Sequence, residues 1–189
     1  CEYVLQFMGL LLDGERWAGY DKPCETLRWL FGSEELISAS KKTCRKTPTC
    51  VTYPEGGVTV VRSKDGCAIL AMDHGPLGFG SIAAHGHADA LSVQLFVNGE
   101  CLIGDPGTYI YHCDLPMRDE LRRTRSHSTV CVGGKDQSEM LGAFMWGKRA
   151  KVSLSVSGVT HEGGYVVEAS HDGPSGYKAR HPRCWGVAK

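Results

Sequence analysis

Apolar and polar positions alternate over short stretches from about residue 58 onward. Such alternation, broken by Gly-rich turns, is typical of antiparallel strands. The clearest example is the stretch 91–97, which Asn98-Gly99 connects to 101–103, because Asn-Gly favours the backbone of a two-residue hairpin turn. The same pattern predicts strands at 58–62 and 67–72, joined by a turn at 64–66, and at 130–132, 150–156 and 165–169.

The beginning of the chain follows a different pattern. Leu5, Met8 and Leu12 recur near helical spacing, as do Leu27 and Leu30. Residues 41–57 carry Lys, Thr, Pro and Gly without periodicity, which is typical of a linker. We therefore expect a helical segment at 1–40, a linker at 41–57 and a mainly β domain, an antiparallel β-sandwich, at 58–189.

Composition narrows the class of protein. The 189 residues are 42% hydrophobic and 22% charged with a formal net charge of zero, so charge gives no reason to expect nucleic acid or an anionic membrane as partner. No apolar run reaches the roughly 18 residues that span a bilayer. The nine cysteines form no CxxC pair, which predicts mostly buried free thiols and allows a cytoplasmic location. The chain starts at Cys1, and we interpret it as a fragment of a longer protein.

Residues that can bind metals or transfer protons gather between positions 85 and 127. The motif His85-Gly86-His87-Ala88-Asp89 comes first, Asp105 follows, and His127 closes the stretch. Imidazole and carboxylate groups bind zinc-like metals, and imidazole and phenol groups also act as general acids or bases. The residue types leave metal binding, proton transfer or both open.

Hairpin geometry sets a condition on this cluster. A regular ladder beyond the Asn98-Gly99 turn would pair Ser92 with Asp105, and a straight strand would hold His87 roughly 16 Å from Ser92. That separation is too large for His87 and Asp105 to share one metal ion. Either Asp105 is no ligand, or the chain curls between residues 88 and 90.

Five blocks, taken together, resemble the heparinase II/III-like polysaccharide lyases. They are HGHADALS at 85–92, NG at 98–99, DPGTY at 105–109, RSHSTV at 125–130 and GKDQSE at 134–139. The resemblance covers about residues 53–171, and the helical start looks like the end of that family's α/α-toroid domain. It implies a β-sandwich behind a toroid, and a lyase that cleaves heparin-like, heparan sulfate-like or alginate-like uronic-acid polysaccharides by β-elimination.

The resemblance also implies roles for single residues. His87, Asp105 and His127 would bind one divalent metal ion, usually zinc and mainly structural, while His85 would be a catalytic acid or base. Tyr111, with Tyr109 close behind, would approach the sugar. Ser128 stands where the family commonly has Asn, Asp89 is expected in a turn or behind the ligands, and an acidic polysaccharide is the expected partner in the periplasm or outside the cell.

An HxH motif in a β-rich chain is also compatible with two other functions. A cupin-like metalloenzyme needs a Glu a few residues after HxH, where this chain has none. A non-catalytic, metal-stapled carbohydrate-binding domain stays open, and we expect the fragment to carry only part of an active site and to be inactive alone. The basic run at residues 118–125 could meet a polyanion, but its interspersed acids favour a solvated helix face.

Overall fold

The computed structural model describes residues 50–159 except 64, residues 165–173, and the backbone of three further short strands. The chain divides into two compact units, Cys1–Thr47 and Pro48–Lys189. In the first unit, β1 (Arg16–Trp17) pairs in parallel with β2 (Lys42–Thr43). The helices predicted for 1–40 lie outside the described residues, except at β1, where the prediction is wrong because the backbone there is extended.

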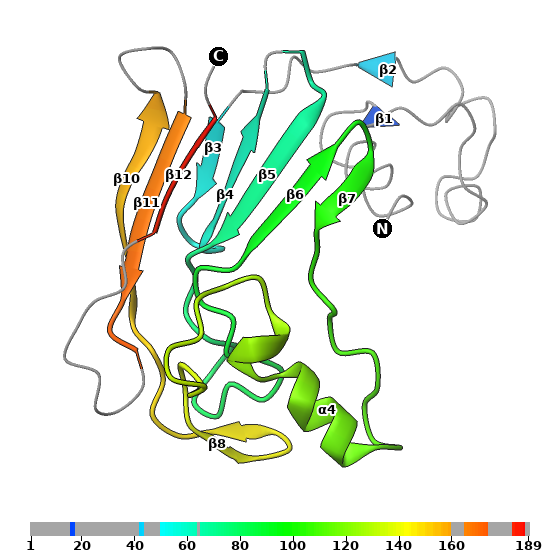
Figure 1. Cartoon of the computed structure of the whole chain (residues 1–189), viewed down its shortest axis with the longest axis vertical. Helices are drawn as coiled ribbons and strands as arrows, with labels where there is room; N and C mark the ends of the chain where they lie inside the picture. Colours follow the sequence, from blue (N-terminus) through cyan, green and yellow to red (C-terminus); the bar gives the residue numbers. More distant parts are fainter. Residues whose placement is uncertain are drawn as a thin grey trace. The chain divides into compact units, whose positions relative to one another are not determined.

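The second unit begins with a five-stranded antiparallel sheet in the order β3-β4-β5-β6-β7 (Figure 1). Asn98 and Gly99 have φ values of 52° and 84°, the left-handed backbone that the two-residue hairpin turn requires, as the sequence predicts. β3 falls in the predicted linker, which is therefore wrong at those residues: they gain backbone hydrogen bonds by pairing with β4. The strands are β3 (Cys50–Tyr53), β4 (Val58–Arg62), β5 (Ala68–Asp73), β6 (Val93–Val97) and β7 (Glu100–Ile103).

The ladder between β6 and β7 is irregular. Val97 pairs with Glu100 as the turn predicts, but Leu95 pairs with Ile103 because the register shifts between Leu95 and Phe96. The regular ladder assumed from the sequence, with Ser92 opposite Asp105, is therefore not formed.

A three-stranded antiparallel sheet packs against the first sheet (Figure 1). Its strands are β10 (Val152–Val159), β11 (Tyr165–His171) and β12 (Arg183–Val187). Alternate residues of β11 point into the same apolar core as residues of the first sheet, which is the arrangement of an antiparallel sandwich. The predicted fold class is confirmed. The core contains Val61, Leu70, Met72, Leu91, Val93, Tyr165, Val167 and Ala169.

Short elements gather beyond one end of the first sheet, where Figure 1 shows α4 and β8. The helix α4 (Leu115–Leu121) begins at Asp114, whose side chain accepts a hydrogen bond from the Met117 backbone N–H. A 3-10 turn, η1 (Thr124–Ser126), and a hairpin of β8 (Met140–Gly142) and β9 (Met145–Trp146) follow. The strand predicted at 130–132 is wrong, since a single bridge from Val132 to Lys135 forms there.

Cysteine burial differs from the expectation. The five cysteines whose side chains the structure describes are free thiols, as predicted, but three are exposed and two are half-buried. The prediction of mostly buried thiols is wrong for these five, because cysteine content alone does not say which strand face a residue occupies. Among the described residues, no helix is long and apolar enough to cross a membrane.

Gly57 lies where the β3–β4 and β5–β6 connections approach each other closely. Its φ is 65°, and a Cβ atom there would lie 2.0 Å from the Gly75 Cα. Gly66 has a similar φ of 75° but no described atom within 4 Å. We expect Gly66→Ala to cost about 1 kcal/mol of unfolding free energy from backbone strain, and Gly57→Ala to cost clearly more. Urea unfolding of both variants measures the difference, and equal costs would mean that this approach can relax.

Candidate functional site

The cluster predicted from the sequence lies at one end of the first sheet. β5 ends there at Asp73, β6 begins at Val93, and β7 ends at Ile103. The connection from β5 to β6 carries the His85–Asp89 motif and forms no strand; instead the Ser92 backbone N–H donates to the Asp89 carbonyl at 2.8 Å. The condition that the chain curls after His87 is therefore confirmed.

Two buried side chains hold this motif by donating hydrogen bonds to the Gly86 carbonyl. The Trp146 Nε1–H donates to that oxygen at 3.0 Å, and the Arg122 Nε–H does so at 3.5 Å. The Ala88 backbone N–H in turn donates to the Arg122 carbonyl at 2.9 Å. Both histidines of the motif are thus fixed by hydrogen bonds to the two residues that follow them, Gly86 and Ala88.

The arginine run on and after α4 is divided between the interior and the surface. Arg118 is 1% exposed and Arg122 is 0% exposed, so the prediction of a solvated face is wrong for these two residues. Each guanidinium lies over an aromatic ring and donates to backbone carbonyls, which compensates for the lost hydration. Arg123 and Arg125 are exposed, as expected.

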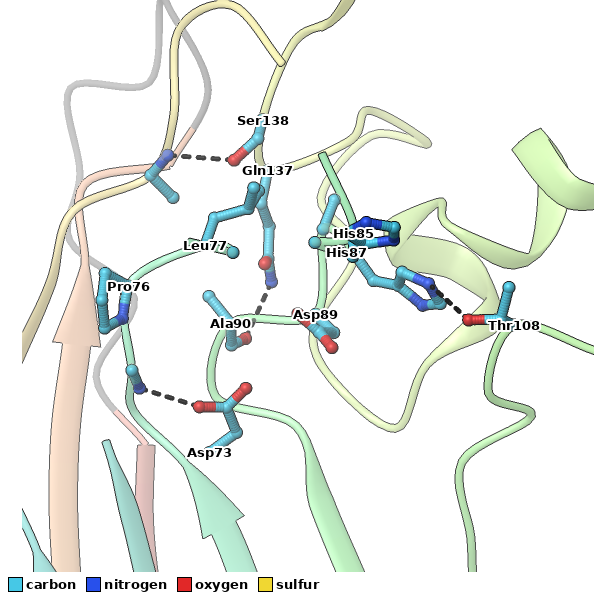
Figure 2. Close-up of a pocket in the computed structure, with 15 residues that line it drawn as sticks. Asp73, Pro76, Leu77, His85, His87, Asp89, Ala90, Thr108, Gln137 and Ser138 are labelled. Carbon is cyan, nitrogen blue, oxygen red and sulfur yellow. Dashed lines mark hydrogen bonds between the residues drawn. The ribbon is translucent and has the colours of Figure 1, made fainter. Parts of the chain in front are cut away.

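Three side chains converge closely enough to hold a metal ion. Each of His87, Asp89 and His127 offers a ligand atom, and these atoms lie within 4.8 Å of one another. Figure 2 shows His87 and Asp89 in a pocket of about 310 Å³, where the His87 Nε2 also lies 3.4 Å from the Thr108 hydroxyl. The sequence predicts Asp89 in a turn or behind the ligands, although its position two residues after His87 is a visible signal that the two side chains can lie close together.

Asp105 is hydrogen-bonded to His127 and so is connected to the cluster of His87, Asp89 and His127. The His127 Nδ1 lies 2.6 Å from the Asp105 Oδ2, and because an ionised carboxylate can only accept, the imidazole donates. The His127 Nε2 is buried and has no hydrogen-bond partner among the described residues. A carboxylate on one ring nitrogen and no partner on the other is the arrangement that orients a metal-binding histidine. The Ser128 hydroxyl donates to the Gly104 carbonyl and so connects the two segments.

Burial and neighbouring groups shift the pKa values of the four titratable side chains in this cluster. Burial, together with the nearby His127, lowers the pKa of His87 to about 4, so its imidazole is neutral and can offer a lone pair. Burial and the neighbouring Asp73 raise the pKa of Asp89 to about 7. The hydrogen bond from His127 lowers the pKa of Asp105. Burial opposes charge on His127, but the contact with Asp105 leaves its pKa raised.

His85 and Tyr111 form a second pair at the mouth of the pocket. A short hydrogen bond joins the Tyr111 hydroxyl to the His85 Nδ1, and the two rings stack with centroids 5.7 Å apart. Tyr111 is 42% exposed, so this pair is accessible. Tyr109 is 85% exposed and forms no hydrogen bond within the described ranges. Of the two tyrosines that the sequence offered, Tyr111 is the one that meets His85.

The fold and this cluster define an antiparallel β-sandwich domain with a His/Asp group at one end that could hold a metal ion. Residues 45–187 match the family described as heparinase II/III-like, C-terminal, and the chain belongs to that family. A search of curated proteins finds no match.

Solved structures with the same fold are heparinases. A heparinase III gene product with methylated lysines has a TM-score of 0.63 at 19% identity, covering 86% of this chain and 24% of that chain. The heparan sulfate lyase HepC from Pedobacter heparinus has a TM-score of 0.60 at 17% identity, covering 86% and 24%. A further heparinase III has a TM-score of 0.62 at 16% identity, covering 87% and 25%. The chain thus spans about a quarter of the length of these proteins.

The raised pKa of Asp89 predicts that the stability of the metal-free protein depends on pH. A carboxyl group whose folded pKa lies above its unfolded value contributes stability at low pH, and that contribution is lost as pH rises through about 7. At pH 8 with a chelator, we therefore expect Asp89→Asn to raise the free energy of unfolding by at least about 1 kcal/mol, and less at pH 5.

Thermal unfolding followed by circular dichroism at both pH values measures this change. Asp65→Asn, which removes an exposed carboxylate, is the control and should bring no gain at pH 8. A gain that is equal at the two pH values would show that Asp89 does not titrate in this range.

Proposed function

We propose that this chain is the C-terminal β-sandwich part of a polysaccharide lyase that cleaves uronic-acid polysaccharides by β-elimination. The observation that carries the proposal is the accessible His85–Tyr111 pair beside the cluster of half-buried His87 and Asp89 with buried His127. The structural relatives, one of which is a heparan sulfate lyase, support a heparin-like or heparan sulfate-like substrate, and alginate-like polymers share the same uronate chemistry. Such an enzyme works in the periplasm or outside the cell.

The chemistry of β-elimination matches the groups at the pocket mouth. The proton on C5, next to the uronate carboxylate, must be removed, and the leaving oxygen on C4 must be protonated. In our proposal His85 and Tyr111 carry these two proton transfers, because they are joined by a hydrogen bond and both reach solvent. The group that neutralises the uronate carboxylate comes from another part of the longer protein, so the 189 residues alone are inactive.

The cluster of His87, Asp89 and His127 fits a divalent metal ion, and we propose zinc. Two imidazole nitrogens and carboxylate oxygens form a donor set that zinc accepts, and the buried Nε2 of His127 has no hydrogen-bond partner among the described residues and can turn to the ion. We propose His87, His127 and Asp89 as direct ligands, with Asp105 orienting His127 through Nδ1. When bound, the ion would supply a fixed positive charge that connects the His87–Asp89 segment to the segment of His127.

Metal affinity distinguishes the two carboxylates. We expect His87→Ala and Asp89→Asn to abolish stoichiometric zinc binding, because each removes a donor. Asp105→Asn should weaken binding about 10- to 100-fold, the range for a residue that orients a ligand. Zinc titration by calorimetry measures all three variants. A larger loss for Asp105→Asn than for Asp89→Asn would instead support Asp105 as the ligand, as the sequence resemblance implies.

Turnover of uronate polymers tests the lyase itself. The full-length protein should produce unsaturated sugar, followed by its absorbance, from at least one uronate polymer. His85→Ala and Tyr111→Phe should each lower kcat at least about 100-fold, since each removes a proton-transfer group. Tyr109→Phe is the matched control and should keep wild-type kcat. Binding of the polymer without any turnover would support a non-catalytic, metal-stapled carbohydrate-binding domain.

A further inference from the structure

We propose that Phe144, held in place by the buried Arg118, is a positioning residue that keeps the Tyr111 hydroxyl on His85. This inference rests on the proposed function, because it concerns the same pair of side chains. Neither residue belongs to the sequence blocks that pointed to the site, and the two lie 26 positions apart in the chain.

Tyr111 lies in a segment that cannot hold it unaided. Residues 104–113 form neither helix nor strand, so no backbone ladder fixes the direction of the Tyr111 side chain. Its ring is 42% exposed, and within the described structure its hydroxyl is hydrogen-bonded to the His85 imidazole alone. The position of the hydroxyl therefore depends on what packs against the ring.

Phe144 packs against both members of the pair. Its ring centroid lies 5.6 Å from that of Tyr111 and 6.1 Å from that of His85, where the two rings meet edge to face. These separations are those of favourable aromatic pairs. Phe144 thus completes a three-ring cluster at the mouth of the pocket.

The Phe144 ring is held by Arg118. The Arg118 guanidinium carbon lies 4.3 Å from the Phe144 centroid and 5.4 Å from the Tyr111 centroid, within the range of a cation–π contact for both rings. Because Arg118 is buried on α4, its charge is shielded from water and such contacts are stronger.

Backbone contacts hold the turn that carries Phe144. Ala143 and Phe144 form the two-residue turn between β8 and β9. The Ala143 carbonyl accepts from Arg118 Nη1 in a short hydrogen bond and from Arg122 Nη1 at 2.8 Å. Arg122 Nη1 also donates to the Gly142 carbonyl at 3.1 Å. Two arginines one turn apart on and next to α4 therefore fix this hairpin.

Core packing does not account for Phe144. The side chain is 41% exposed, and it lies outside both apolar clusters of the described structure. An exposed phenylalanine at a hairpin turn adds little to folding stability, whereas its aromatic and cation–π contacts with described residues are to Tyr111, His85 and Arg118. The geometry fits a role in placing the reactive pair.

The test compares Phe144→Leu, which removes the ring, with Phe144→Tyr, which keeps it, in the full-length protein. The first measurement is the crystal structure of each variant, because it needs no activity. In Phe144→Leu we expect the hydrogen bond between Tyr111 and His85 to be lost or to occur in only part of the molecules; in Phe144→Tyr we expect it to be kept. A fully kept hydrogen bond in Phe144→Leu overturns the proposal, even if the protein proves not to be a lyase.

The second measurement is kinetic, in the wild-type and Tyr111→Phe backgrounds. If uronate turnover is found, Phe144→Leu should lower kcat about 10-fold or more with KM and melting temperature nearly unchanged, since small misplacements of reacting groups are costly. It should have no further effect once Tyr111 is Phe, because the two changes then act through one group. Met145→Ala, an exposed change on the same hairpin, is the control and should keep wild-type kcat. A rise in KM alone, or an equal loss in both backgrounds, overturns the proposal.

Discussion

The site depends on one buried positive charge, the guanidinium of Arg122. It lies 4.7 Å from the centroid of the Trp146 ring and donates to carbonyl oxygens of the HxH segment and of the β8–β9 hairpin. A charge removed from water must have partners, because leaving it unpaired costs several kcal/mol. The segments that supply these partners must therefore assemble together, and the same assembly brings the histidines of the motif into place.

The hydrogen bonds to Gly86 hold both histidines of the motif, which point to different partners. His85 and His87 flank Gly86, whose carbonyl receives both Trp146 and Arg122. One imidazole meets an accessible phenol, while the other lies near the half-buried carboxyl group of Asp89. Gly86 is closely packed as well, because a Cβ there would lie 2.6 Å from the Leu77 side chain and 3.0 Å from the Gly78 backbone. A larger residue there would have to displace the Leu77 side chain, which also lines the pocket.

The features that the sequence predicts correctly are those that depend on neighbouring residues. The Asn98-Gly99 turn, the alternating strands and the antiparallel sandwich follow from backbone preference and side-chain period, and the structure has all three. The need for a bend after His87 also follows, because a straight strand could not bring the polar side chains together. What sequence reasoning missed depends on tertiary partners: the burial of Arg118 and Arg122 needs carbonyls and rings from distant segments, and the β6–β7 register shift has no composition signal. The place of Asp89 with His87 and His127 depends on a turn whose direction only packing decides.

The two ends of the first sheet are connected very differently. At one end Asn98-Gly99 joins β6 to β7 in a tight turn, and a short connection joins β4 to β5; at the other end the long segment between Asp73 and Val93 carries the motif. Tight hairpins form from neighbouring residues, whereas the pocket needs residues from β5 through β9 to meet. Opening of the pocket end is therefore separable from melting of the sheet. The ladder of β4–β6 can therefore stay formed while the segments around the pocket open.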